Sequence, residues 1–118
     1  MCRFEFASAP EAGTTDVKVY WAGSVTSDSV KDNPGGTVGV DGDYKNGDEL
    51  EWVEQLTLIG IFHPTADADI AQVEIINDEF MPPTRWGMPV VLDNTGVTWA
   101  SDAVEMCVAF VPIVDEVQ

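Results

Sequence analysis

Basic residues are scarce in this chain of 118 residues, which has five Lys and Arg, one His and 21 Asp and Glu. The formal net charge is therefore −16. Binding to nucleic-acid phosphates requires clustered Lys and Arg, so this composition excludes nucleic acid as a favourable partner. The imbalance grows along the chain, because residues 46 to 118 contain fourteen acids and Arg85 as their one base.

Long hydrophobic runs are also missing. No apolar stretch approaches the roughly 20 residues that a membrane-spanning helix requires. Residues 1–6 lack the charged and then apolar order of a secretory signal. We therefore expect no membrane association and no export by that route.

Cysteine and histidine are nearly absent as well. Cys2, Cys107 and His63 are the only residues of these types, and no zinc-ligand or catalytic-triad spacing connects them. We expect His63, which precedes Pro64, to be a turn residue, and Cys107 to act as a small hydrophobic residue in an apolar strand. Pairs of nearby acids are explained by composition. We therefore expect no enzymatic activity and no cofactor.

An acidic turn containing Asp41, Asp43 and Asp48 has some likeness to a calcium loop. The EF-hand pattern requires an oxygen ligand at position five and Glu at position twelve, where this chain has Lys45 and Trp52. The match therefore fails. A different calcium site with these three carboxylates is the alternative, but we expect an exposed acidic turn without bound metal, since turns favour Asp, Asn and Gly.

The residues that are abundant predict strands. Hydrophobic residues make up 45% of the chain, and they recur with period two: Val17, Val19 and Trp21 alternate with polar neighbours, as do Val73 and Ile75. Gly, Pro and Asn clusters separate the segments. The sequence predicts an all-β fold, a single antiparallel β-sandwich or jelly roll of about eight strands. Strands are expected near 3–8, 16–26, 37–40, 49–54, 56–63, 70–77, 88–92, 97–100 and 103–114.

The domain organisation is simple. We expect an N-terminal strand or arm with its loop in residues 1–15 and one β-sandwich domain in residues 16–118. Residues 7–15 fit either a plain surface loop or a linker that lets the N-terminal strand reach away from the body.

Two segments break the alternation, because residues 56–62 and 104–114 carry apolar side chains at both parities. Both faces of these segments need burial, which the chain's own loops or another subunit can supply. We expect Val111 and Ile113 to face a partner, and Pro112, which has no N–H to donate, to lie at a sheet edge.

The chain contains four tryptophans. By parity we expect Trp21, Trp52 and Trp99 to point into the core. Trp86 follows Arg85 in a proline-rich loop, and two interpretations remain open. The pair forms either an interface contact, since Arg and Trp dominate such contacts, or an intramolecular cation–π contact.

The surplus of Asp and Glu resembles the composition of proteins from salt-loving microbes or their viruses. A high salt concentration screens the mutual repulsion of the acids. Two alternatives for the acidity are a basic partner surface and bound divalent cations.

The layout resembles that of small β-sandwich or jelly-roll proteins of virus particles, through the run of short strands, the Asn46-Gly47-Asp48 turn and the apolar last strand. The resemblance implies a decoration, cement or minor capsid protein that assembles in the host cytoplasm and resides in the virion. It implies homo-oligomers, trimers among them, and contacts with other shell proteins. The alternative is a carbohydrate-binding or adhesion module that uses its Trp residues for sugar stacking.

Overall fold

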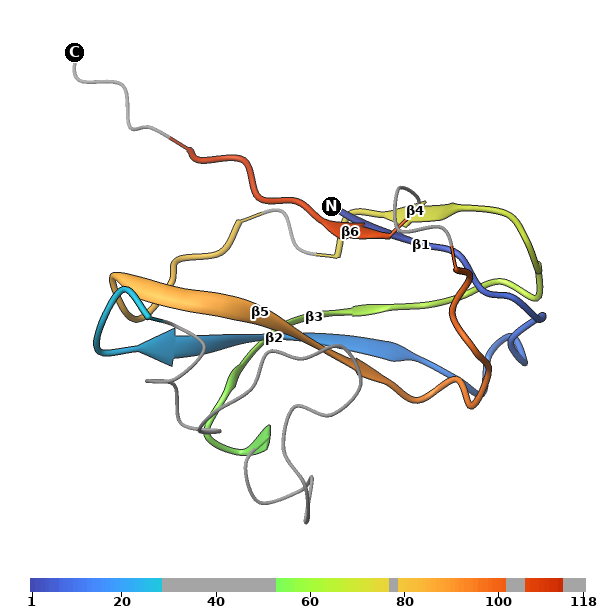
Figure 1. Cartoon of the computed structure of the whole chain (residues 1–118), viewed down its shortest axis with the longest axis horizontal. Helices are drawn as coiled ribbons and strands as arrows, with labels where there is room; N and C mark the ends of the chain where they lie inside the picture. Colours follow the sequence, from blue (N-terminus) through green and yellow to red (C-terminus); the bar gives the residue numbers. More distant parts are fainter. Residues whose placement is uncertain (29–52, 77–78, 102–105, 114–118) are drawn as a thin grey trace.

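The computed structural model describes residues 1–28, 53–76, 79–101 and 106–113. In these ranges the chain forms six strands in two antiparallel sheets of three strands each, with the orders β4-β1-β6 and β3-β2-β5 (Figure 1). The all-β class predicted from the sequence is thereby confirmed. The strands are β1 (Cys2–Phe4), β2 (Val17–Ser24), β3 (Thr57–Phe62), β4 (Gln72–Glu74), β5 (Trp86–Asp93) and β6 (Cys107–Val108).

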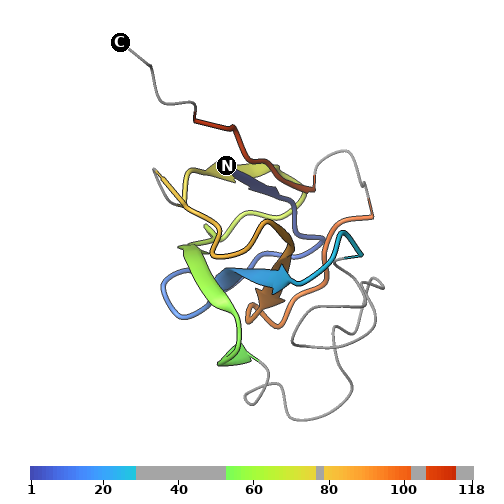
Figure 2. The ribbon, with the colours of Figure 1, turned by 90° about the vertical axis from the view of Figure 1, so that its left-hand side faces the viewer.

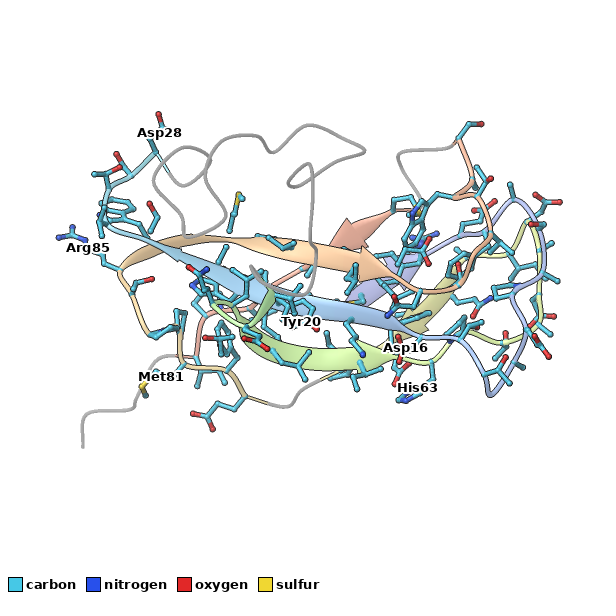
Figure 3. All side chains as sticks on the ribbon, turned by 90° about the horizontal axis from the view of Figure 1, so that it is seen from below. Asp16, Tyr20, Asp28, His63, Met81 and Arg85 are labelled. Atoms are coloured by element: carbon cyan, nitrogen blue, oxygen red, sulfur yellow. The ribbon has the colours of Figure 1, made fainter. Side chains whose placement is uncertain are left out.

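The larger sheet is built around β2. This strand pairs with β5 over its whole length, from Val17 opposite Asp93 to Ser24 opposite Trp86. It pairs with β3 on its other side, with a register shift between Val19 and Tyr20 (Figure 3). The alternation that predicted a strand over 16–26 therefore corresponds to the central strand of this sheet.

The smaller sheet is built around β1 and lies above the larger one in Figure 2. Cys2 is opposite Glu74 of β4 and Val108 of β6. Backbone hydrogen bonds between Met1 and Ala109 continue the β1–β6 pairing by one residue. Residues 1–6 are thus part of the body, and residues 7–15 connect its two sheets.

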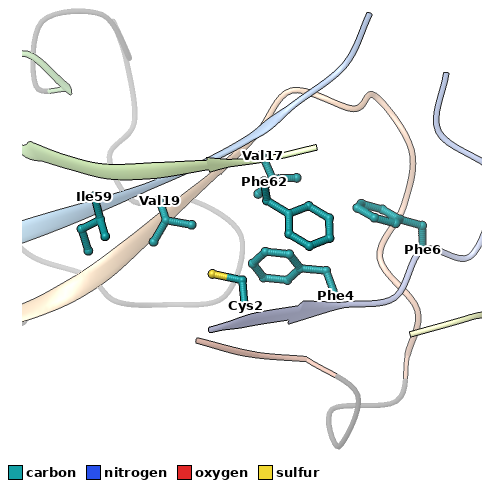
Figure 4. Packing of buried hydrophobic residues seen from close by; sticks show 7 residues of the cluster. All are labelled: Cys2, Phe4, Phe6, Val17, Val19, Ile59 and Phe62. Atoms are coloured by element: carbon teal, nitrogen blue, oxygen red, sulfur yellow. The ribbon is translucent and has the colours of Figure 1, made fainter. Parts of the chain in front are cut away.

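The main core lies between the two sheets (Figure 4). Phe4 meets Phe62 edge to face with 5.0 Å between ring centroids, and Phe6 stacks on Trp99 at 5.1 Å. Such aromatic pairs add to the stabilisation from burial of apolar area. The buried side chains of this core cluster are Cys2, Phe4, Phe6, Val17, Val19, Ile59 and Phe62.

A second apolar cluster covers the opposite face of the larger sheet. Tyr20, Ala22 and Val90 are buried there, and Val53 and Leu56 pack against them. The chain's own residues therefore supply part of the second layer that the apolar pattern of 56–62 requires. Leu58 on the same strand remains 49% exposed.

Several strands are shorter than the alternation predicts. In the segment 97–100, Trp99 forms an isolated bridge with Phe6, and no strand includes the other residues. The segment expected to be a strand over 103–114 pairs with β1 only near Cys107–Val108, and the described residues after Ala109 are extended but outside any ladder.

The prediction of a strand over 49–54 is wrong for residues 53 and 54, the part of this segment that the structure describes. The N–H of Leu56 donates to the carbonyl of Val53 at 3.0 Å and closes a turn there. Residues 49–52 and the expected strand at 37–40 lie outside the described residues.

Candidate interaction surface

The side of the smaller sheet that faces away from the core has an unusual composition. Cys2, Phe4 and Phe6 point into the core and are at most 3% exposed, so the residues between them point outward. These are Arg3 and Glu5, both partly exposed.

The neighbouring strands add apolar side chains to this side. Val73 and Cys107 are directly opposite Arg3 on its two flanks, and both are exposed. Val73 is 58% exposed and Ile75, two residues further along, is 69% exposed. We refer to this surface as the outer face; its residues are Met1, Arg3, Glu5, Val73, Ile75 and Cys107, continued by Val111 and Ile113.

The polarity of β4 is the reverse of what a half-buried strand usually shows. Its apolar residues are on the outer face, whereas Gln72 and Glu74 point toward the larger sheet. The Glu74 carboxylate accepts a hydrogen bond from the His63 N–H at 2.9 Å, and the Gln72 amide oxygen accepts one from the Thr65 N–H at 2.7 Å. These bonds connect the two sheets and leave the apolar side chains of β4 in water.

The segment after β6 extends beyond the smaller sheet (Figure 1). Val111 is 84% exposed and Ile113 is 68% exposed, and their expected role as contact residues stays a prediction. Phe110, between Val111 and β6, packs edge to face on Trp21 with 5.8 Å between ring centroids. This contact holds the segment to the larger sheet while Val111 and Ile113 remain exposed.

Among the described residues of the outer face, the charged side chains are Arg3 and Glu5, which have opposite signs. The terminal ammonium donates to the Ala109 carbonyl at 3.0 Å. Exposed apolar side chains beside so few described charges are typical of protein interaction sites.

Arg85 and Trp86, the other predicted contact residues, lie elsewhere. Trp86 is the first residue of β5, at one end of the larger sheet, and Arg85 directly precedes it, whereas His63 lies at the opposite end (Figure 3). The Arg85 guanidinium carbon is 5.1 Å from the centroid of the Trp86 ring, so the intramolecular cation–π contact forms. Trp86 is still 40% exposed. Because Arg85 covers one face of the indole, that face is not available to a stacking ligand.

The other tryptophans that the structure describes lie in the core as expected. Trp21 and Trp99 both pack against the main cluster, and Trp52 lies outside the described residues. The prediction for Cys107 is wrong: its side chain is exposed because it shares the outer face with Arg3. Cys2 is buried, and both thiols are free.

A shallow hollow of about 270 Å³ lies beside the inter-sheet hydrogen bonds and is lined by Phe62, His63, Thr65, Gln72, Val73 and Glu74. The His63 ring approaches Glu74, with 3.5 Å between Nδ1 and Oε1. His63 and Glu74 thus both help to connect the two sheets. The expected turn residue His63 therefore has a specific partner, Glu74. The pairing of His63 with Glu74 could not be predicted from the sequence, because eleven residues separate the two.

Within the described ranges, no group of three or more His, Cys, Asp or Glu is arranged to hold a metal ion. The candidate ligands Asp41, Asp43 and Asp48 lie outside these ranges. The same part of the chain contains no helix long and apolar enough to cross a membrane.

Comparison with known proteins gives no relative. No family model matches the chain, and neither the curated proteins nor the solved structures contain a significant match. The functional argument therefore depends on the surface itself.

Proposed function

We propose that this protein is a structural component of a virus particle, a decoration, cement or minor capsid protein that binds other proteins through its outer face. The observation that carries the proposal is the exposure of Val73 and Ile75 on β4 and of Val111 and Ile113 in the segment after β6. Burial of such side chains contributes roughly 25 cal/mol for each Å² of apolar area removed from water, which favours a protein contact at this site. The complete fold in this proposal is a β-sandwich or jelly roll of about eight strands, which the two described sheets fit in part.

The distribution of charge supports a position on the outside of the shell. A net charge of −16 beside packaged nucleic acid would be costly, because both carry negative charge at close range. The acid-poor outer face can instead approach a shell protein while the acidic remainder stays in solvent. In this arrangement the protein takes part in homo-oligomers, trimers among them, and in contacts with other shell proteins.

The proposal is tested by co-sedimentation. Particles from cells that produce the protein are banded on a density gradient and probed for the wild type and for Ile75→Lys. We expect the wild type to band with particles and Ile75→Lys to remain at the top of the gradient. Val25→Lys is the matched control, because Val25 is 85% exposed in the turn after β2 and outside the outer face.

Two results would count against the proposal. The first is absence of the wild-type protein from every particle band. The second is specific binding to a glycan array that is lost on Trp86→Ala, which would favour the carbohydrate-binding alternative.

A further inference from the structure

We infer that the outer face binds a second copy of this chain, with the β1 strands of the two copies antiparallel across the contact. The inference rests on the proposed function, since it identifies one of the partners of that surface. The carrying observation is the placement of Arg3 and Glu5 two residues apart on the exposed side of β1, with the apolar residues Val73 and Cys107 beside them.

This placement is self-complementary. Symmetric dimers use the same surface on both copies, so each group must find its complement on an identical surface. A twofold axis that runs between the copies, perpendicular to β1 and level with Phe4, places Arg3 of each copy opposite Glu5 of the other. It also stacks β4 on β4 and β6 on β6, at the roughly 10 Å spacing of packed sheets.

The net charge of the protein favours a second copy of the chain over a basic protein as the partner of the outer face. A basic partner is attracted to the faces rich in Asp and Glu, whereas Glu5 is the one acid among the described residues of the outer face. A second copy carries the same −16 and can approach closely only where acids are few. At the outer face two ion pairs replace that repulsion, and the surrounding apolar side chains leave water.

Charge reversal tests the inference by sedimentation velocity at about 0.15 M salt, where exposed charges more than roughly 8 Å apart are largely screened but contact pairs are not. We expect the wild type to form dimers. Arg3→Glu and Glu5→Arg should each weaken dimerisation by roughly tenfold or more, because each creates like charges across the contact. An equimolar mixture of the two variants should form dimers again, since one copy then presents two acids and the other two bases.

The mixture separates an intermolecular pair from damage to the fold. A variant that has lost stability is not repaired by mixing, and circular dichroism melts of each variant verify folding. Dimers of undiminished strength in both single variants, or a mixture that stays monomeric, would overturn the inference.

Cys107 provides a second readout that requires no change of charge. It is exposed on the outer face while Cys2 is buried, so a short bismaleimide should crosslink two copies through Cys107. Cys107→Ser should abolish the product. Moving the thiol to the loop between the sheets, as Ala12→Cys in the Cys107→Ser background, should not restore it.

Failure here is distinguishable from failure of the proposed function. A protein that co-sediments with particles but gives neither dimers nor crosslinks contradicts the self-contact alone. A protein that dimerises through this face but is absent from all particles contradicts the virion assignment alone.

Discussion

Phe4 is the side chain on which contact between the two sheets most depends. It is 3% exposed and lies 5.0 Å from the Phe62 ring and 5.1 Å from the Trp99 ring, measured between centroids. We expect Phe4→Ala to lower the free energy of unfolding by about 3–5 kcal/mol, as for other large-to-small core changes. Urea denaturation measures the loss.

The matched control is Phe110→Ala, because Phe110 also contacts a Trp ring but is 47% exposed. It should cost clearly less than Phe4→Ala. Equal losses for the two variants would mean that the inter-sheet contact is not the main source of stability.

The buried Cys2 thiol lowers the stability of the folded protein as the pH becomes alkaline. Burial raises the pKa of the Cys2 thiol above its ordinary value of 9.0, because the thiolate is poorly solvated in the core. As the pH rises through 9.0 the unfolded chain loses this proton and the folded chain keeps it, so the free energy of unfolding falls. Below that pH the two states hold the proton equally and the contribution is constant.

We therefore expect the stability advantage of wild type over Cys2→Ala to shrink between about pH 7 and about pH 10. Urea denaturation of the two proteins at the two pH values measures it. An advantage that stays constant for Cys2 would show that its thiol ionises as readily in the folded protein as in the unfolded chain.

At the scale of elements, the packing of β5 against Trp21 requires a glycine. A Cβ at Gly87 would lie 2.5 Å from atoms of the Trp21 indole, which Phe80 and Phe110 hold on its other sides. We expect Gly87→Ala to displace the ring, to cost about 1–3 kcal/mol and to shift the tryptophan fluorescence.

Gly96→Ala is the comparison. A Cβ there meets no atom within 4 Å, but the residue has a φ of +70°, so the cost is backbone strain of about 1–2 kcal/mol. This variant should leave the fluorescence unchanged. A Gly87→Ala protein with wild-type fluorescence would mean that the indole does not pack on β5.

The strands also show how much of the fold could be predicted from the sequence alone. Alternation correctly predicted β2, where both Val17 and Val19 are buried. It did not predict the segment after β6, where Phe110, Val111 and Ile113 are all exposed whatever their parity. For β4 the alternation identified a strand but could not say which face meets the core. That choice depends on hydrogen bonds that Gln72 and Glu74 accept from backbone N–H groups of the loop after β3, which residue periodicity does not encode.

Only part of the outer face could therefore be predicted from the sequence. The part contributed by the segment after β6 could be inferred from an excess of apolar residues. The part contributed by Val73, Ile75 and the exposed side of β1 depends on strand order, because it forms only when β1 lies between β4 and β6. Two-residue strands such as β6 are also too short for a periodic signal.

At the scale of the whole molecule, the charge of −16 predicts stabilisation by salt. The Debye length falls from about 10 Å at 0.1 M to about 3 Å at 1 M, so repulsion among the acids fades. The Tm should rise by several degrees between about 0.1 and about 2 M sodium chloride. Sodium chloride is preferable to sulfate, which stabilises proteins generally. A flat or falling Tm would mean that the acids are compensated in another way.

The central claim, that the protein assembles through its outer face, is tested most directly by hydroxyl-radical footprinting of the assembled and the dissociated protein. This measurement reports the solvent exposure of individual side chains. We predict that Met1, Ile75 and Cys107 lose reactivity on assembly, while Met81 and Trp86, which are 84% and 40% exposed outside that face, keep theirs. Protection of Met81 and Trp86 with unchanged reactivity of Met1, Ile75 and Cys107 would contradict the account.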